Sequence, residues 1–502
     1  MPKQVTLQLN SFQDGLSKSI YQGGKNQFAP GTREMDFMIA PGIIQPNLTL
    51  ANQADLQTNN PVNRNVRAVI RASNATYYWA GQDAAGTPLA RIMSGDPSAD
   101  TSLTLLGAGG IAASNYTNGT KIAEFDDDLF FYVGGTDLHK FDIGGAALSS
   151  QANGSALTNN IGLDLLNYKT FLFYCNSNNV GRAINTTTYN NTALVLETRY
   201  RVTSLTPWFG KVIVGARTQN EGGNSRLFIW DGVSTLVDYS VEVPDTGLAA
   251  AVNNEGIIFI FCGSNPNGNA DRNILRIYIW AGGDKVQLLR ELDLENSAVG
   301  SFQIRPAGVS TKGGKVYFTL DAGTTNTMTI ANGVYSIDSR GVLNFEYIDA
   351  ASQDTADLSG FYCQWIEGDL FWFFGDGTNN RKQNHNGLTY SSQARLDTVA
   401  LQFDPRYESR IDEIFFRTIS LPASVSIAVS IATDQASFSA VKTFDADNAV
   451  FNIAINQNDF AFQPGTTHQL RFAFTSSSAS RVRIILPIFI RATVFDAQTL
   501  TS

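Results

Sequence analysis

The sequence predicts an all-β protein: a six- or seven-bladed β-propeller followed by a C-terminal antiparallel β-sandwich, with an extended N-terminal arm. Three observations predict this class. The 502 residues include 43 Gly, 32 Phe and 17 Tyr, a composition typical of strands and turns. A short apolar segment recurs along the middle of the chain. The C-terminal segment alternates strictly between apolar and polar residues.

The recurring segment is a run of apolar residues that usually follows a turn. Such a run, bounded by Gly and Asp, indicates a strand buried on both faces. The copies are spaced by roughly 40 to 60 residues, as expected for propeller blades. They are ATYYWAG from Ala75, DDLFFYVGG from Asp127, YKTFLFYC from Tyr168, GKVIVGA from Gly210, EGIIFIFC from Glu255, GKVYFTL from Gly314 and GDLFWFFGDG from Gly368.

A second repeated element is a hairpin. RLFIWDGVSTL at 226–236 has the same pattern as RIYIWAGGDKV at 276–286, and looser copies start at Gly333 and Asp137. The alternating residues 227–230 predict a strand with one face in water. Trp-Asp-Gly or Trp-Ala-Gly then supplies a tight turn, because Gly accepts positive φ at little cost.

The repeating unit is therefore an apolar strand, a loop, an alternating strand, a turn and a strand leading out. One such sheet cannot bury both of its faces, but a ring of copies buries them all and leaves few open edges. Residues 62–396 are predicted to form this ring, with seven blades favoured over six. The alternative is a stack of β-sandwich domains, which requires a spacing of roughly 90 to 100 residues.

The flanking segments differ from the ring. Residues 1–61 are rich in Gly, Gln, Asn and Pro, and they predict an extended arm that lies over its own domain or a neighbour. Residues 397–502 predict the β-sandwich, from phrases such as SVSIAVSIAT and HQLRFAFTSS. Within it, residues 475–480 predict a flexible hairpin tip, and Pro487 belongs at a sheet edge or a bulge.

Charge and cysteine content exclude several classes of protein. The formal net charge is −9 and only 16% of residues are charged, so a basic face for specific nucleic-acid binding is not expected. Cys175, Cys262 and Cys363 lie far apart in or beside apolar strands, which predicts buried thiols rather than disulfides or a metal site. The start of the chain predicts no secretory signal, and no segment predicts membrane insertion.

The histidines do not form a catalytic pattern. His139, His385 and His468 fall in three separate sections, without the partner spacing of a metal-binding motif. We expect His139 to face solvent from a strand, His385 to lie in a polar loop and His468 to begin a strand of the sandwich.

Three other segments resemble known turn or binding motifs in part. Residues 336–341 resemble the Asp-box turn of sialidase-like propellers, but the Gly comes one residue late. Residues 265–273 place polar side chains at alternate positions, as in calcium loops, with only Asp271 charged. The run 126–128 predicts a solvated turn. We therefore expect no catalytic, cofactor-binding or metal-binding residue and no cofactor, and a protein that is not an enzyme.

The two ends of the chain carry a family resemblance. The residues are Phe12-Gln13-Asp14-Gly15-Leu16-Ser17, Asn26-Gln27-Phe28 and Pro41-Gly42, followed near the other end by RIDEIFFRTI and PGTTHQLRFAFTSSSASRVRIILPIFI. Together with the blade hairpins, they resemble the β-propeller-bearing tail structural proteins of tailed bacteriophages, nozzle-like or tail-tip and fibre-like.

The resemblance implies a non-enzymatic virion component that acts through assembly. Expected partners are other virion tail proteins, further copies of the chain in a ring or trimer, and a host-surface receptor. The expected location is the virion tail, after synthesis in the host cytoplasm. The alternative function is receptor or glycan binding, for which Trp365 and Trp372 are candidates, although packing between blades is the expected role of both. A glycosidase or depolymerase is the least favoured hypothesis, since the sequence does not identify the pair of catalytic carboxylates that glycoside hydrolysis requires.

Overall fold

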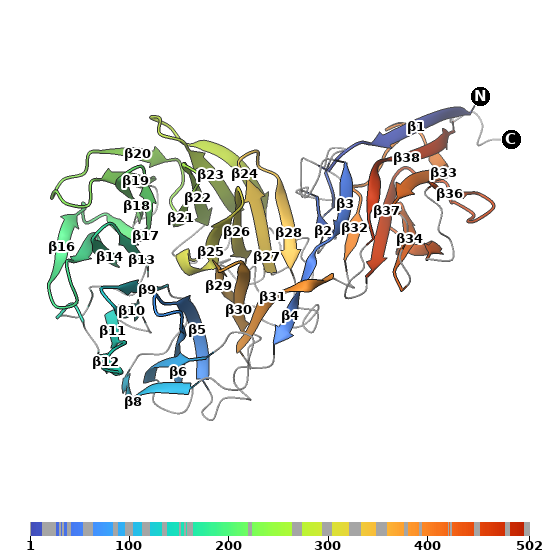
Figure 1. Cartoon of the computed structure of the whole chain (residues 1–502). Helices are drawn as coiled ribbons and strands as arrows, with labels where there is room; N and C mark the ends of the chain where they lie inside the picture. The colour runs from blue at the N-terminus through green and yellow to red at the C-terminus, as the bar shows by residue number, and fades with distance from the viewer. Residues whose placement is uncertain are drawn as a thin grey trace.

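The computed structural model is an all-β structure, in which a ring of small sheets lies beside a body made of two sheets (Figure 1). The described residues are 2–12, 27–29, 32, 35–37, 42–53, 64–83, 89–95, 104–112, 121–132, 138–149, 152–154, 157, 164–218, 223–263, 274–293, 304–320, 333–347, 359–375, 380–390, 394–419, 421, 424–445, 452–476 and 482–495.

Within these residues the ring contains seven four-stranded antiparallel sheets, called blades one to seven. Blade one consists of β5 (Arg64–Arg71), β6 (Tyr77–Asp83), β7 (Leu89–Ser94) and β8 (Thr104–Ala112). Blade two consists of β9 (Ile122–Phe125), β10 (Asp128–Tyr132), β11 (Leu138–Asp142) and β12 (Ala147–Ser149). Blade three consists of β13 (Leu165–Tyr168), β14 (Phe171–Asn176), β15 (Asn179–Ala183) and β16 (Tyr189–Val195).

Blades four and five are β17 (Tyr200–Trp208), β18 (Lys211–Thr218), β19 (Ser225–Trp230) and β20 (Tyr239–Val243), then β21 (Leu248–Asn254), β22 (Ile257–Gly263), β23 (Ile274–Trp280) and β24 (Gln287–Asp293). The short 3-10 helix Pro306–Gly308 precedes blade six, which is β25 (Val309–Lys312), β26 (Lys315–Leu320), β27 (Gly333–Asp338) and β28 (Leu343–Tyr347). Blade seven is β29 (Ser359–Ile366), β30 (Asp369–Gly375), β31 (Asn380–Tyr390) and β4 (Leu48–Gln53).

The first strands of the blades form a closed circle. Each of β5, β9, β13, β17, β21, β25 and β29 contacts the next, and β29 contacts β5. The ring is therefore a β-propeller. Its last blade is completed by β4, which comes before the first blade in the sequence and pairs with β31. The predicted domain limits, 62–396 for the propeller and 397–502 for the sandwich, stay predictions.

The seven apolar segments are confirmed as strands, and each is the second strand of its blade. In β10 every residue is buried. The prediction that the strand at 227–230 has one solvent-exposed face was wrong, because all four side chains are buried. Leu227 and Ile229 pack with blade five, whereas Phe228 and Trp230 pack with blade three, so neighbouring blades cover both faces of this strand.

The repeated Trp closes the turn after the third strand. Trp230 Nε1 donates to the Ser234 carbonyl at 2.7 Å, and Trp280 Nε1 donates to Gly283 at 2.6 Å in the next blade. Asp231 Oδ1 accepts from the Ser234 backbone N–H at 2.8 Å, and Gly232 has φ +83°. The indole and the carboxylate together satisfy the backbone of the turn.

Turns between the first and second strands are bound to the next blade. Lys169 Nζ donates to the Gly210 carbonyl at 2.7 Å, and Trp208 Nε1 donates to Gly256 at 2.8 Å. Lys312 Nζ donates to Gly368 at 2.8 Å in the same manner. Because successive strands alternate in direction, these turns and those between third and fourth strands share one face of the ring, which we call the turn face.

The C-terminal body consists of two sheets. One contains β1 (Lys3–Leu9), β2 (Met35–Asp36), β3 (Ile43–Pro46), β38 (Ile484–Val494), β33 (Ser409–Thr418) and β36 (Asn452–Asn456); the other contains β32 (Arg395–Asp397), β37 (His468–Thr475), β34 (Ser426–Thr433) and β35 (Ser439–Phe444). Phe416 of the first sheet meets Phe472 of the second edge-on, with ring centroids 5.4 Å apart. Pro487 lies opposite an irregularity in the β33–β38 ladder, which confirms its predicted place at a bulge.

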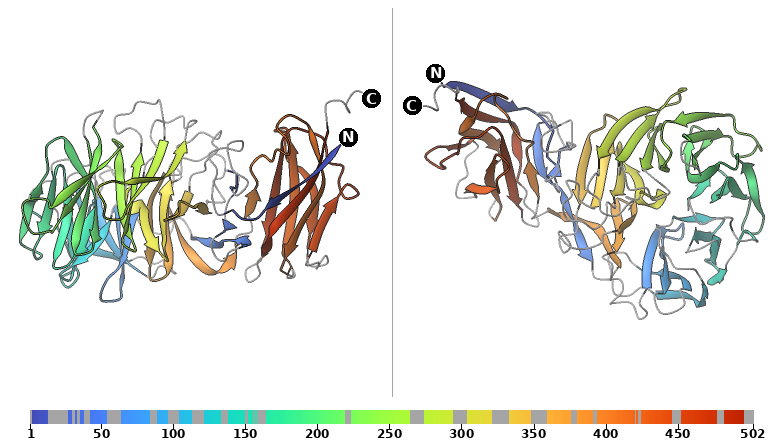
Figure 2. Two further views of the ribbon diagram at one scale, coloured as in Figure 1. Left: turned by 90° about the horizontal axis from the view of Figure 1, so that it is seen from above. Right: turned by 180° about the vertical axis from the view of Figure 1, so that it is seen from behind.

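The arm contributes strands to both bodies. β1 and β3 pair with β38, β4 pairs with β31, and β2 lies beside β28 of blade six (Figure 2). Met35 and Ile44 belong to a hydrophobic cluster that also contains Phe318 of blade six and Phe416 of the C-terminal body. The arm therefore joins the propeller to the C-terminal body through a shared core.

Candidate functional site

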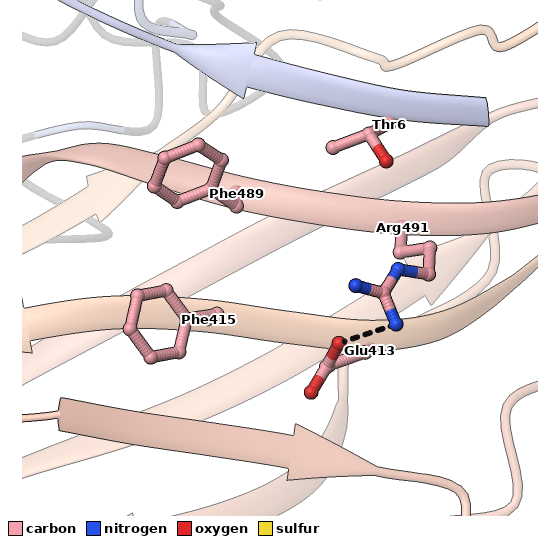
Figure 3. Close-up of a pocket in the computed structure, with 5 residues that line it drawn as sticks. All are labelled: Thr6, Glu413, Phe415, Phe489 and Arg491. Atoms are coloured by element: carbon pink, nitrogen blue, oxygen red, sulfur yellow. Dashed lines mark ion pairs between the residues drawn. The ribbon is translucent and has the colours of Figure 1, made fainter.

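The outward face of the six-stranded sheet has a hollow of about 260 Å³. It is lined by Thr6 of β1, Glu413 and Phe415 of β33, and Phe489 and Arg491 of β38 (Figure 3). The two phenylalanine rings lie side by side with centroids 6.0 Å apart. Arg491 and Glu413 form an ion pair with an N–O distance of 3.2 Å. The site thus combines two aromatic side chains, two charged side chains and one threonine.

Strand register explains why these side chains meet. Phe415 is opposite Phe489, and Glu413 is opposite Arg491. Side chains alternate along a strand, so the intervening Ile414 and Ile490 point inward and are fully buried. Thr6 pairs with Arg491 on the other side of β38, so the arm supplies one wall of the hollow.

The composition of the hollow suits contact with a protein side chain. Its volume is below the ~300 Å³ at which small-molecule pockets usually begin. Aromatic residues and Arg are the side chains that protein interfaces favour. Arg491 has 54% of its side chain exposed, and Glu413 has 30%, so both charges reach solvent. The hollow can take one protruding apolar side chain beside two charges that can change partners.

A second polar cluster lies buried where the arm meets blade six. Burial raises the pKa of the Glu346 carboxyl above its usual range, although nearby Lys315 opposes the shift. Asn47 Nδ2 donates to Glu346 Oε2 at 2.8 Å, and Ser336 donates its hydroxyl proton to the other carboxylate oxygen. Asn344 Nδ2 also donates to the Met35 carbonyl at 2.9 Å. These bonds fasten the arm to the propeller.

The structure corrects two of the three histidine predictions. His139 was expected to face solvent but is fully buried on β11, 5.6 Å from the Phe131 ring, because each blade face is covered by a neighbour. His385 was expected in a loop but lies in β31, where it pairs with Leu50 of the arm. His468 begins β37, as predicted.

The other candidates occupy structural positions. Trp372 is fully buried, and Trp365 packs edge-on against Tyr317 of blade six, so packing between blades is confirmed for both. Asp338 accepts bonds from the Arg340 and Val342 backbone N–H groups and thereby holds its own turn.

The turn predicted at 126–128 is confirmed for Asp126 and Asp127, which are exposed with positive φ, whereas Asp128 is buried beside Lys140. The stretch 265–273 and most of the predicted tip 475–480 lie outside the described residues. Cys175, Cys262 and Cys363 are buried free thiols, as predicted.

Among the described residues, no group of three or more His, Cys, Asp or Glu side chains is placed to hold a metal ion. The same part of the chain contains no helix that is long and apolar enough to span a membrane.

The sequence patterns did not point to the hollow. Phe415 and Phe489 occupy outward positions of alternating strands, where polar residues are usual, and this is the signal that could have found them.

No protein family matches the chain, and no curated protein matches its sequence. Its fold is similar to that of several solved β-propellers. BamB from Moraxella catarrhalis shows 12% identity over 77% of this chain and 100% of that chain, with a TM-score of 0.41. The WD40 propeller domain of Doa1 shows 13% identity over 65% and 95% of the two chains, with a TM-score of 0.41. YCF48 from Cyanidioschyzon merolae shows 10% identity over 67% and 99%, with a TM-score of 0.43.

Proposed function

We propose that this protein is a non-enzymatic structural component of a bacteriophage virion, in the tail, as a nozzle-like, tail-tip or fibre-attachment part. It acts by assembling into a homo-oligomeric ring or trimer and by contacting other tail proteins. In this proposal residues 397–502 form a β-sandwich that serves as a docking domain.

The observation that carries the proposal is the path of the arm. Its strands complete the last propeller blade and the six-stranded sheet, and a continuous hydrophobic cluster runs between them. A chain tied together in this way transmits force without bending at a linker, which suits a mechanical part of a particle. The resemblance of the sequence to phage tail proteins is the reason for proposing that this particle is a phage virion.

The experiment is to locate the chain in particles. Virions are purified from a host carrying the wild-type gene and from one carrying an early stop codon. Mass spectrometry should find the chain in the first preparation, and electron microscopy should show incomplete tails in the second. Complete, infectious particles that lack the chain would overturn the proposal.

A parallel measurement addresses catalysis. The purified chain is incubated with host capsule and cell-surface polysaccharide, and released reducing ends are counted. The proposal expects no release above buffer. Release that scales with protein concentration would favour a depolymerase instead.

A further inference from the structure

Phe209 is the most exposed large apolar side chain in the described part of the propeller, at 77%. It lies at the tip of the turn between β17 and β18, with φ +38°. The same turn position has positive φ in other blades, so this backbone conformation belongs to the repeat, and only the bulky apolar side chain is unusual there. The matching first turn positions in blades two, five and seven hold Asp126, Glu255 and Glu367. The phenyl side chain of Phe209 is therefore a departure from the charged residues at the matching positions of these three blades.

The ring of Phe209 is held in place by its neighbours. It rests on Gly256 of blade five, where a Cβ atom would come within 2.9 Å of it. Trp208, the preceding residue, packs against Trp280 with centroids 4.6 Å apart and against Phe209 itself at 5.1 Å. Because the tip is already ordered, little entropy is lost when a partner binds it.

Blade four carries further exposed apolar side chains on the same face of the ring. Leu236 is 75% exposed, and Val233 and Tyr239 are also exposed. All three lie in or beside the turn between β19 and β20, on the turn face. Lys211 and Asp238 form an ion pair there at 2.8 Å. A protruding aromatic ring, with exposed apolar side chains and one exposed ion pair on the same face of its blade, has the composition of a protein interface.

We propose that Phe209 of one copy inserts into the hollow of the next copy and packs against the Phe415 and Phe489 rings that line it. The inference rests on the proposed assembly function and assigns its contact. Blade four and the six-stranded sheet lie at opposite ends of the molecule (Figures 1 and 2), so the contact joins two copies. A protruding side chain and a complementary hollow on different surfaces form a head-to-tail contact, which closes into a ring when the rotation permits.

Charge supports the same pairing. The hollow carries Arg491 beside Glu413, and the tip carries Lys211 beside Asp238. Lys211 and Asp238 carry the charges opposite to those of Glu413 and Arg491, so the tip can supply a partner for each charge of the hollow. This complementarity favours a second copy of the chain as the occupant of the hollow.

The first test compares assembly of the full-length wild type, Phe209→Asn and Val195→Asn by sedimentation velocity over a concentration series. Val195 is an exposed side chain at the opposite end of its blade from the turn face, and it is the matched control. Wild type and Val195→Asn should form the same oligomer over the same concentration range. Phe209→Asn should form that oligomer only at a protein concentration at least tenfold higher. Asn tolerates positive φ, so folding is preserved. Equal assembly of all three would overturn the inference.

The second test locates the contact by cross-linking. Phe209→Cys and Thr6→Cys chains are mixed under a mild oxidant; the native thiols are buried, and burial raises their pKa values, so they do not compete. A disulfide-linked pair should form in the mixture and not with Val195→Cys in place of Phe209→Cys. An oligomer without this cross-link, or a wild type that stays monomeric, overturns the inference. The proposed function is judged separately, by the presence of the chain in virions.

Discussion

Trp208 of blade four packs against Trp280 of blade five, with ring centroids 4.6 Å apart, while its indole N–H donates to the Gly256 carbonyl at 2.8 Å. One side chain thus supplies both an aromatic contact and a hydrogen bond between neighbouring blades. The next residue in the chain, Phe209, packs against Trp208 but keeps most of its ring exposed, and its φ is +38°. The fold and the proposed interface meet at this pair of residues.

Replacing Phe209 with Asn should raise the stability of the isolated chain. Relief of positive φ on a bulky residue is worth about 1 kcal/mol, and little apolar burial is lost from a side chain that is 77% exposed. Urea unfolding at low protein concentration measures the change. Val195→Asn should alter the free energy of unfolding by less than about 0.5 kcal/mol. A destabilised Phe209→Asn chain would show that the ring serves the fold.

Asp231→Ala should weaken blade four. The carboxylate accepts from the Val233 backbone N–H at 2.7 Å and from Ser234 at 2.8 Å, and the loss of such turn bonds costs about 1 kcal/mol. Chemical denaturation measures the resulting change in the free energy of unfolding. The control is Asp284→Ala, which removes an exposed carboxylate from the matching turn of blade five. Equal effects of the two substitutions would contradict this account of the repeat.

Acid should destabilise the C-terminal body through His468. Burial lowers the pKa of this imidazole below its usual 6.5, while the nearby Ser409 carbonyl opposes the shift. The unfolded chain therefore binds the proton more readily, and stability is lost as pH falls below 6.5 towards the lowered value. Thermal unfolding of wild type and His468→Gln between pH 7.5 and 5.5 measures this. A pH slope that survives the substitution would assign the effect to other groups.

Removal of residues 1–53 should destabilise both bodies together. Blade seven loses β4, and β38 loses β1 and β3. The melting temperature should fall by more than about 5 °C, since each kcal/mol corresponds to about 2–4 °C in domains of 150–250 residues. Calorimetry of this chain is compared with one that lacks only residues 1–9. An unchanged melting curve would show that the arm merely decorates the surface.

The local sequence pattern was enough to predict the second strand of each blade. These strands are covered on both faces, and their sequences are therefore continuous runs of apolar residues. The local pattern was not enough for contacts made between distant segments. The burial of His139 follows from a neighbouring blade, and the strand at His385 follows from pairing with Leu50. Neither partner leaves a trace in the residues beside the histidine.

The hollow escaped prediction for a related reason. Phe415 and Phe489 are separated by more than seventy residues, and Thr6 comes from the other end of the chain. Their meeting depends on the order of strands in the sheet, which alternation alone does not specify. The strand content of the C-terminal segment was predictable from its period, whereas its surface chemistry required the register.

The pairing of Asn52 with Gln383 has a consequence for biosynthesis. The ribosome makes β4 about 330 residues before its partner β31, so the early strand must wait while six blades emerge. Closing the circle is then a late, long-range event, which makes it slow relative to the hairpins that precede it. A nascent chain stalled before blade seven would carry an unclaimed strand, and that intermediate is where chaperones have most to protect.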